Sequence, residues 1–249
     1  MMDDFGFPVS AGDFRFQAES MIVRRLLGGV ERNGAVLDLG CGVGHWAEEF
    51  AHSFSRVVAV EGSNALYRTL EERCALHSNI RVIQGNALSF EPDGDYSLVF
   101  LGGLLMYLDE NDVIALLQKL IPHLGPDGII LCRESTVRGE TVTRAGDYPV
   151  VYRSVSDYKR IFGQCGLIIR HVERNEPYAL MQMGCELIKK WKRVVPEPFQ
   201  ALRIVGRLTY WCMRLGSLGI KRIPQVPGIE FPSLDNHFFT LGACPIVKE

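Results

Sequence analysis

The chain has 249 residues, of which 47% are hydrophobic and 22% are charged, and its formal net charge is −2. This composition is that of a folded globular protein, and it excludes a disordered chain, a collagen-like repeat and a small disulfide-stapled domain. The balanced total charge also excludes a protein whose whole surface attracts polyanions.

Apolar segments and helical periodicity alternate along most of the chain. Residues 1–17 read as a partly ordered arm, and residues 17–31 have the apolar spacing of a helix. Seven short apolar segments predict strands at 35–39, 56–60, 80–83, 96–101, 128–132, 167–172 and 237–242. Helical spacing lies between them at 45–53, 65–76, 109–124 and 155–165. This alternation is typical of parallel β-α-β units whose sheet is covered by helices on both faces.

Three features indicate the cellular compartment. The seven cysteines are dispersed without a C-x-x-C pair, which indicates reduced thiols rather than a disulfide framework. The N-terminal Met1-Met2-Asp3-Asp4 is acidic where a signal peptide is basic. The longest charge-free apolar run, over 96–108, has 13 residues, whereas a membrane-spanning helix needs about 20. We therefore expect a soluble, cytoplasmic protein.

The most informative segment is the turn after the first strand, where residues 36–46 read VLDLGCGVGHW. Gly40, Gly42 and Gly44 have no Cβ atoms, so the backbone can turn sharply there and approach a ligand, and the following helix N-terminus offers free N–H groups. Glu61 closes the second strand, 21 residues after Gly40. Because a carboxylate at this place accepts hydrogen bonds from ribose hydroxyls, the spacing favours an adenosine-type ligand.

Two known phosphate-binding patterns do not fit this loop. A dinucleotide fingerprint needs a glycine where this chain has His45, and the G-K-[ST] of a P-loop is absent. The loop instead resembles the V-L-D-L-G-C-G-x-G motif of class I S-adenosylmethionine-dependent methyltransferases. The segments QGNA (84–87), DYSLVF (95–100) and LGPDG (124–128) resemble later motifs of that family, and residues 17–172 match it in order and spacing.

The resemblance implies an α/β fold with a Rossmann-like, doubly wound, mostly parallel seven-stranded sheet, helices on both faces and a helical insertion before the last strand. It implies S-adenosyl-L-methionine as the cofactor and S-adenosyl-L-homocysteine as its product, with no metal. The cofactor contacts it implies are Asp38, Gly40, Cys41, Gly42, Glu61, Gly62, Asn86, Ala87 and Leu101. Asp38 is alternatively a brace of the glycine loop, Asn86 (usually Asp in the family) a simple cap, and Cys41 a small packing residue.

A hydroxyl acceptor of the methyl group would require a general base, whereas an amine needs only to arrive neutral. The base should lie at the carboxyl ends of the parallel strands. Glu134 ends the fifth strand and His237 opens the seventh, which runs antiparallel in this family, so both are candidates. The alternative roles are a salt bridge of Glu134 with Arg133 or Arg153, and a surface or packing role for His237.

Residues 186–222 form a basic segment, with nine Lys and Arg against two acids. Helical spacing near 187–195 and 202–215 places the basic residues opposite or beside apolar ones. Such helices form a lid or a homodimer contact, or they bind an anionic membrane or an acidic partner. We expect a core over 1–177, a helical insertion over 178–235 and the last strand over 236–249.

We expect an S-adenosylmethionine-dependent methyltransferase that acts on an O or N nucleophile of a small molecule such as a sugar, glycan or secondary metabolite. The alternatives are a methyltransferase of protein N-termini or other peptides, and a non-catalytic protein that binds the cofactor or its product. A dinucleotide oxidoreductase is disfavoured by His45. Duplex nucleic acid is disfavoured because no basic patch lies outside 186–222, and residues 101–104 read LGGL rather than the [D/N]-P-P-[Y/F] of enzymes that methylate nucleobase or glutamine amino groups.

Overall fold

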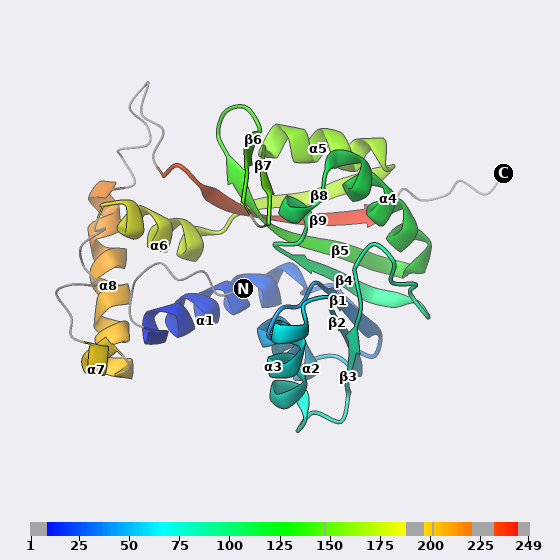
Figure 1. The fold of residues 1–249 in the computed structure, drawn as a ribbon, viewed down its shortest axis with the longest axis horizontal. Coiled ribbons are helices and arrows are strands. Elements are labelled where there is room, and N and C mark those ends of the chain that lie inside the picture. Colours follow the sequence, from blue (N-terminus) through cyan, green and yellow to red (C-terminus); the bar gives the residue numbers. More distant parts are fainter. Residues whose placement is uncertain (1–8, 147, 188–196, 201, 221–231, 244–249) are drawn as a thin grey trace. The chain divides into compact units, whose positions relative to one another are not determined.

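A computed structural model describes residues 9–146, 148–187, 197–200, 202–220 and 232–243 (Figure 1). The chain divides into two compact units. The α/β unit comprises Gly28–Glu173 and His237–Glu249, and the helical unit comprises Met2–Leu27 and Arg174–Asn236. This division differs from the expected boundaries, because residues 2–27 and 174–177 group with the insertion rather than with the core.

The α/β unit is built on one mostly parallel sheet of nine strands. The strand order is β3-β2-β1-β4-β5-β7-β6, and β9 pairs with β5 and β8. The strands are β1 (Ala35–Leu39), β2 (Arg56–Glu61), β3 (Ile80–Gln84), β4 (Tyr96–Gly102), β5 (Leu124–Val137), β6 (Val142–Arg144), β7 (Val150–Ser154), β8 (Leu167–Arg174) and β9 (Asp235–Ala243). All seven predicted strands are present, so the predicted fold class is confirmed. The short antiparallel pair β6–β7 was not predicted.

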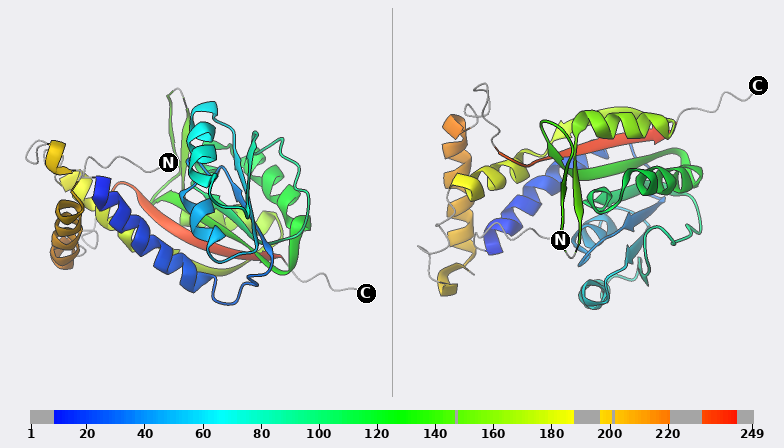
Figure 2. Two further views of the ribbon diagram at one scale, coloured as in Figure 1. Left: turned by 90° about the horizontal axis from the view of Figure 1, so that it is seen from below. Right: turned by 45° about the horizontal axis from the view of Figure 1, so that its top comes forward.

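Helices cover both faces of this sheet, as the burial along β4 shows. Val99 and Leu101 belong to a core cluster with side chains of α4 (Glu110–Leu120) and α5 (Val155–Gln164). Phe100 points the opposite way, because side chains alternate along a strand, and its ring lies 5.1 Å from that of Trp46 on α2 (His45–Ala51). The helix α3 (Asn64–Cys74) follows β2. Figure 2 shows α5 running along β9. The rings of Tyr158 and Phe162 on α5 lie 5.4 and 5.5 Å from that of Phe239 on β9.

The helical unit contains α1 (Val9–Leu26), α6 (Glu176–Leu187), α7 (Glu197–Gln200) and α8 (Arg203–Ile220). The expected arm is wrong for residues 9–16, which are helical, and residues 1–8 lie outside the described residues. The apolar pattern missed the start of α1 because this helix buries polar side chains, among them Arg15 and Glu19. Glu19 accepts hydrogen bonds from Arg15 and from Asn175, and Asn175 also donates to Asn236.

Among the helices in the described ranges, none combines the length and the apolar character that a bilayer-crossing segment needs.

Candidate functional site

The glycine loop between β1 and α2 has the backbone conformation that its sequence predicted. Gly40, Gly42 and Gly44 have positive φ angles of 72°, 60° and 85°, a region that residues with a Cβ rarely adopt. There is also no space for larger residues at two of them. A Cβ on Gly40 would lie 3.0 Å from the side chain of Leu104, and one on Gly44 would lie 2.6 Å from that of Leu70.

Glu61, at the carboxyl end of β2, is bound to this loop. One oxygen of its carboxylate accepts the N–H of Gly42 at 2.8 Å, and the other accepts the N–H of Ser63 at 2.7 Å. Its side chain is buried, so it is not a solvated strand end. Because a carboxylate oxygen has two lone pairs, each oxygen can still accept one hydrogen bond from a ligand hydroxyl.

Asp38 lies inside β1 and is almost completely buried. The pKa of its carboxyl is raised to about 8, mainly by burial and also by the nearby charge of Glu61, against the lowering effect of the N–H of Ala47 in the first turn of α2. Its second oxygen has no hydrogen-bond partner among the described residues. Asp38 is thus tied to α2, the helix that follows the glycine loop, and its second oxygen is unused.

The loop after β3 lies next to the end of β2. A Cβ on Gly62 would lie 3.3 Å from the carbonyl oxygen of Gly85, so the two loops are in close contact. Asn86 is exposed, and its side-chain oxygen accepts the N–H of Leu88 at 2.8 Å, which is the capping role stated as the alternative. The Asn86 side chain fixes its own turn, and Ala87 packs against the core of the α/β unit.

Burial limits the chemistry of two further predicted contact residues, Leu101 and Cys41. Leu101 is fully buried in the core cluster, so any contact of this residue with a ligand has to come from its main chain. Burial, with the charges of Asp38 and Glu61 nearby, raises the pKa of the Cys41 thiol well above its ordinary value. The thiol therefore stays protonated and is unsuited to act as a nucleophile.

Glu134, near the end of β5, is fully buried. One of its oxygens accepts the N–H of Leu105 at 3.1 Å, and the other has no hydrogen-bond partner in the described part of the chain. Burial raises the pKa of this carboxyl to about 8, against the lowering effects of the Leu105 N–H and of Arg133 and Arg153. At neutral pH the group is therefore largely protonated.

Arg153 on β7 binds the segment that Glu134 also binds. Its guanidinium donates to the carbonyl oxygens of Leu105 at 2.8 Å and Leu108 at 2.7 Å. Glu134 and Arg153 thus fix the short 3-10 helix Leu105–Tyr107 that follows β4. From the sequence, Arg153 was named only as a salt-bridge partner of Glu134. Leu104, which lies against Gly40, and Ser63, which donates to Glu61, were not predicted, because these contacts have no local sequence signal.

His237 opens the part of β9 that belongs to the α/β unit. Its Nδ1 lies 2.8 Å from the hydroxyl oxygen of Thr136, near the end of β5. The end of β5 therefore meets the start of β9, which makes this pair antiparallel. Thr136 is two residues beyond Glu134, so both candidate bases, Glu134 and His237, lie at the carboxyl end of the parallel strands.

Comparisons with known proteins agree with this geometry. The family model for a methyltransferase domain matches residues 36–128. Phosphoethanolamine N-methyltransferase 1 of Arabidopsis thaliana is 26% identical over 157 residues, which are 62% of this chain and 31% of that protein. The cypemycin N-terminal methyltransferase of a Streptomyces species is 32% identical over 95 residues, 37% of this chain and 38% of that protein. The chain spans about a third of the length of these curated relatives.

Solved structures show the same fold at low sequence identity. Coclaurine N-methyltransferase bound to N-methylheliamine and SAH superposes with a TM-score of 0.63 at 14% identity, covering 91% of this chain and 70% of that one. A SAM-dependent methyltransferase of Leishmania major gives 0.62 at 14% identity, covering 90% and 72%. Residues 36–128 thus match the family model of a methyltransferase domain, and the chain shares its fold with solved S-adenosylmethionine-dependent methyltransferases.

Proposed function

We propose that the chain binds S-adenosylmethionine beside residues 40–44 and Glu61 and transfers its methyl group to a nitrogen or oxygen nucleophile of a small molecule. The observation that carries this proposal is the hydrogen bond between Gly42 and Glu61. It holds a carboxylate next to a loop of left-handed glycines, where both can contact one nucleoside.

The residues present fit the cofactor. Glu61 keeps one acceptor site on each oxygen for the two ribose hydroxyls. The glycine loop exposes main chain without Cβ atoms, and Asp38 has a buried oxygen that lacks a partner. When bound, the cofactor supplies a methyl group already activated by its sulfonium. The work left to the protein is to orient the acceptor and exclude water.

We place the acceptor's reacting group where the carboxyl end of β5 meets the start of β9. Glu134 is protonated at neutral pH because its pKa is about 8, so it can donate a hydrogen bond there but is a poor base below that pH. His237, positioned by Thr136, is then the proposed base for a hydroxyl acceptor. An amine that arrives neutral needs neither group as a base.

Titration calorimetry with S-adenosylmethionine, S-adenosylhomocysteine and NAD tests the cofactor. We expect the first two to bind and NAD not to bind. Glu61→Ala removes a charged hydrogen-bond acceptor and should weaken binding by about 1–3 kcal/mol, while Glu72→Ala, on an exposed face of α3, should leave it unchanged. Binding of NAD alone would overturn the proposal, and equal affinity in the Glu61 variant would remove this residue from the site.

A methyl-transfer assay with labelled S-adenosylmethionine tests the acceptor. The panel contains a phosphorylated primary amine, a sugar, a phenol and a peptide with a free N-terminus. The peptide is included because the 32% identical relative is an N-terminal methyltransferase. Transfer to the peptide alone would favour the peptide alternative, and cofactor binding without transfer to any acceptor would favour a non-catalytic binding protein.

A further inference from the structure

The long helix of the helical unit has an apolar stripe exposed to solvent. Its members follow the spacing i, i+4, i+7, i+11, and they are between 46% and 67% exposed: Ile204, Leu208, Trp211 and Leu215. At 100° per residue, these four side chains fall within a sector of about 60° of α8. Four large apolar side chains in one row form a continuous patch rather than scattered exposed residues.

The stripe is not needed to hold the helical unit together, because α8 packs through its other side. A Cβ on Gly206 would lie 2.6 Å from the main-chain nitrogen of Ala11 in α1, so the two helices cross in close contact there. Tyr210 belongs to a buried cluster with Ala11, Leu180 and Met181. The stripe lies on the opposite face of α8 and is available for a partner.

The charge next to the stripe identifies the kind of partner. Arg203, Arg207 and Arg214 are exposed and fall within about 40° of one another along one flank of the stripe. The guanidinium of Arg214 lies 5.2 Å from the Trp211 ring centroid. The helix contains no Asp or Glu. An apolar row with Trp, bordered by arginines alone, is the pattern of a helix that lies in the interface of an anionic bilayer.

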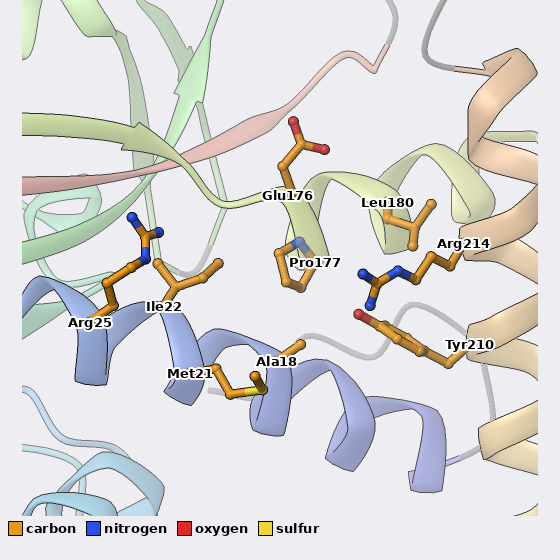
Figure 3. A pocket seen from close by; sticks show the side chains of 9 residues that line it. All are labelled: Ala18, Met21, Ile22, Arg25, Glu176, Pro177, Leu180, Tyr210 and Arg214. Carbon is orange, nitrogen blue, oxygen red and sulfur yellow. The ribbon is translucent and has the colours of Figure 1, made fainter.

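A cavity lies on the neighbouring face of α8. It has a volume of about 450 Å³ and lies between α1, α6 and α8 (Figure 3). Met21, Ile22 and Leu180 give it an apolar lining, Arg25 and Arg214 contribute two cationic groups, and Glu176 contributes one acidic group. In Figure 3 the guanidinium of Arg214 points toward the hydroxyl end of Tyr210. Arg214 both lines this cavity and borders the stripe.

From these observations we infer that the helical unit docks on an anionic lipid surface through the α8 stripe, with Arg203, Arg207 and Arg214 at the level of the lipid phosphates. A second copy of the chain fits less well. Two α8 stripes packed antiparallel would bring their arginine flanks to the same side of the pair, and α8 has no acidic residue to pair with them. Of the basic segment expected at 186–222, residues 188–196, 201, 221 and 222 lie outside the described residues and carry no part of the inference.

Co-sedimentation of the full chain with vesicles tests the inference. We expect binding to vesicles that contain phosphatidylglycerol and much weaker binding to pure phosphatidylcholine. High salt should weaken the binding, because it screens the arginines. Trp211 fluorescence should shift to the blue and be quenched by brominated lipid, and both changes should be lost in Trp211→Phe.

Matched variants separate the stripe from the rest of the surface. Arg207→Glu should weaken vesicle binding more than fivefold, since each basic residue near an anionic surface contributes about a fivefold effect. Arg68→Glu makes the same change of charge on exposed α3 and should have little effect. Leu208→Ser should also weaken binding, while Leu76→Ser, at a residue 95% exposed in the α/β unit, should not. Circular dichroism and the melting temperature check that each variant is folded.

Two results would overturn the inference. One is vesicle binding that is equal in the stripe variants and in their controls. The other is sedimentation velocity showing a dimer that Leu208→Ser dissociates, with no vesicle binding by the native chain, because a second copy would then cover the stripe.

Discussion

Glu134 and Arg153 bind the main chain of the same residue: an oxygen of the Glu134 carboxyl group accepts the N–H of Leu105, and the Arg153 guanidinium donates to the Leu105 carbonyl oxygen. Both side chains are buried. Glu134 on β5 and Arg153 on β7 therefore both fix the segment that follows β4. This segment also carries Leu104, whose side chain packs on Gly40, so the two residues support the glycine loop indirectly.

The protonation of Glu134 should make the stability of the protein depend on pH. Its pKa is raised from 4.5 to about 8 in the folded chain, so between these values the folded state binds the proton more tightly than the unfolded state. The free energy of unfolding therefore falls as pH rises through this window, by up to roughly 1.4 kcal/mol per pH unit. Glu134→Gln keeps an acceptor for Leu105 without a charge. Urea unfolding at pH 6, 7 and 8 should show a weaker fall in this variant, whereas parallel curves would contradict the assignment.

Removal of the Arg153 guanidinium should destabilise the α/β unit strongly. Arg153→Ala leaves the carbonyls of Leu105 and Leu108 without their charged donor, at an expected cost of about 2–4 kcal/mol. Arg160→Ala is the control, because the Arg160–Glu110 pair is largely exposed and such pairs contribute only about 0–1 kcal/mol. Chemical denaturation of the two variants measures both values, and equal losses would contradict the role given to Arg153.

The glycine loop should tolerate alanine poorly. At Gly44 a Cβ would combine a φ of 85° with a contact of 2.6 Å to Leu70, so Gly44→Ala should destabilise by about 1–3 kcal/mol. Gly163 in α5 has open space for a Cβ, and Gly163→Ala should stabilise the chain by about 0.5–1 kcal/mol. Melting temperatures of the two variants should move in opposite directions. A shift of the same sign in both would contradict the steric argument.

The sequence predicted those parts of the fold whose signal is local. Uniformly apolar strands such as Val57–Val60 can only be buried on both faces, and the loop of Gly40, Gly42 and Gly44 needs a turn that only glycine makes easily. The pair β6–β7 was missed because all three residues of β6 are exposed, which leaves no apolar pattern to detect. The start of α1 was missed because its buried face includes charged residues that form hydrogen bonds.

In the candidate site, too, only the features with a local sequence signal could be predicted. The order of strand, loop and acid predicted that Glu61 and the glycine loop face one ligand, but it did not predict the hydrogen bond between Gly42 and Glu61. The contacts of Glu134 with Leu105 and of His237 with Thr136 join residues 29 and 101 positions apart, and they depend on strand pairings that no local spacing reveals. Both residues could be named as strand-end candidates, but their partners could not be predicted.

The helical unit combines residues that come before β1 with residues that follow β8, because α1 packs against α6 and α8. During synthesis, α1 leaves the ribosome long before its partners exist, while β1 to β5 can already pair within one continuous stretch. The buried Glu19 and Arg15 then have no complete set of neighbours until Asn175 and Asn236 have been made. Assembly of the helical unit is therefore one of the last steps of folding, and a truncated product would leave α1 without its apolar contacts.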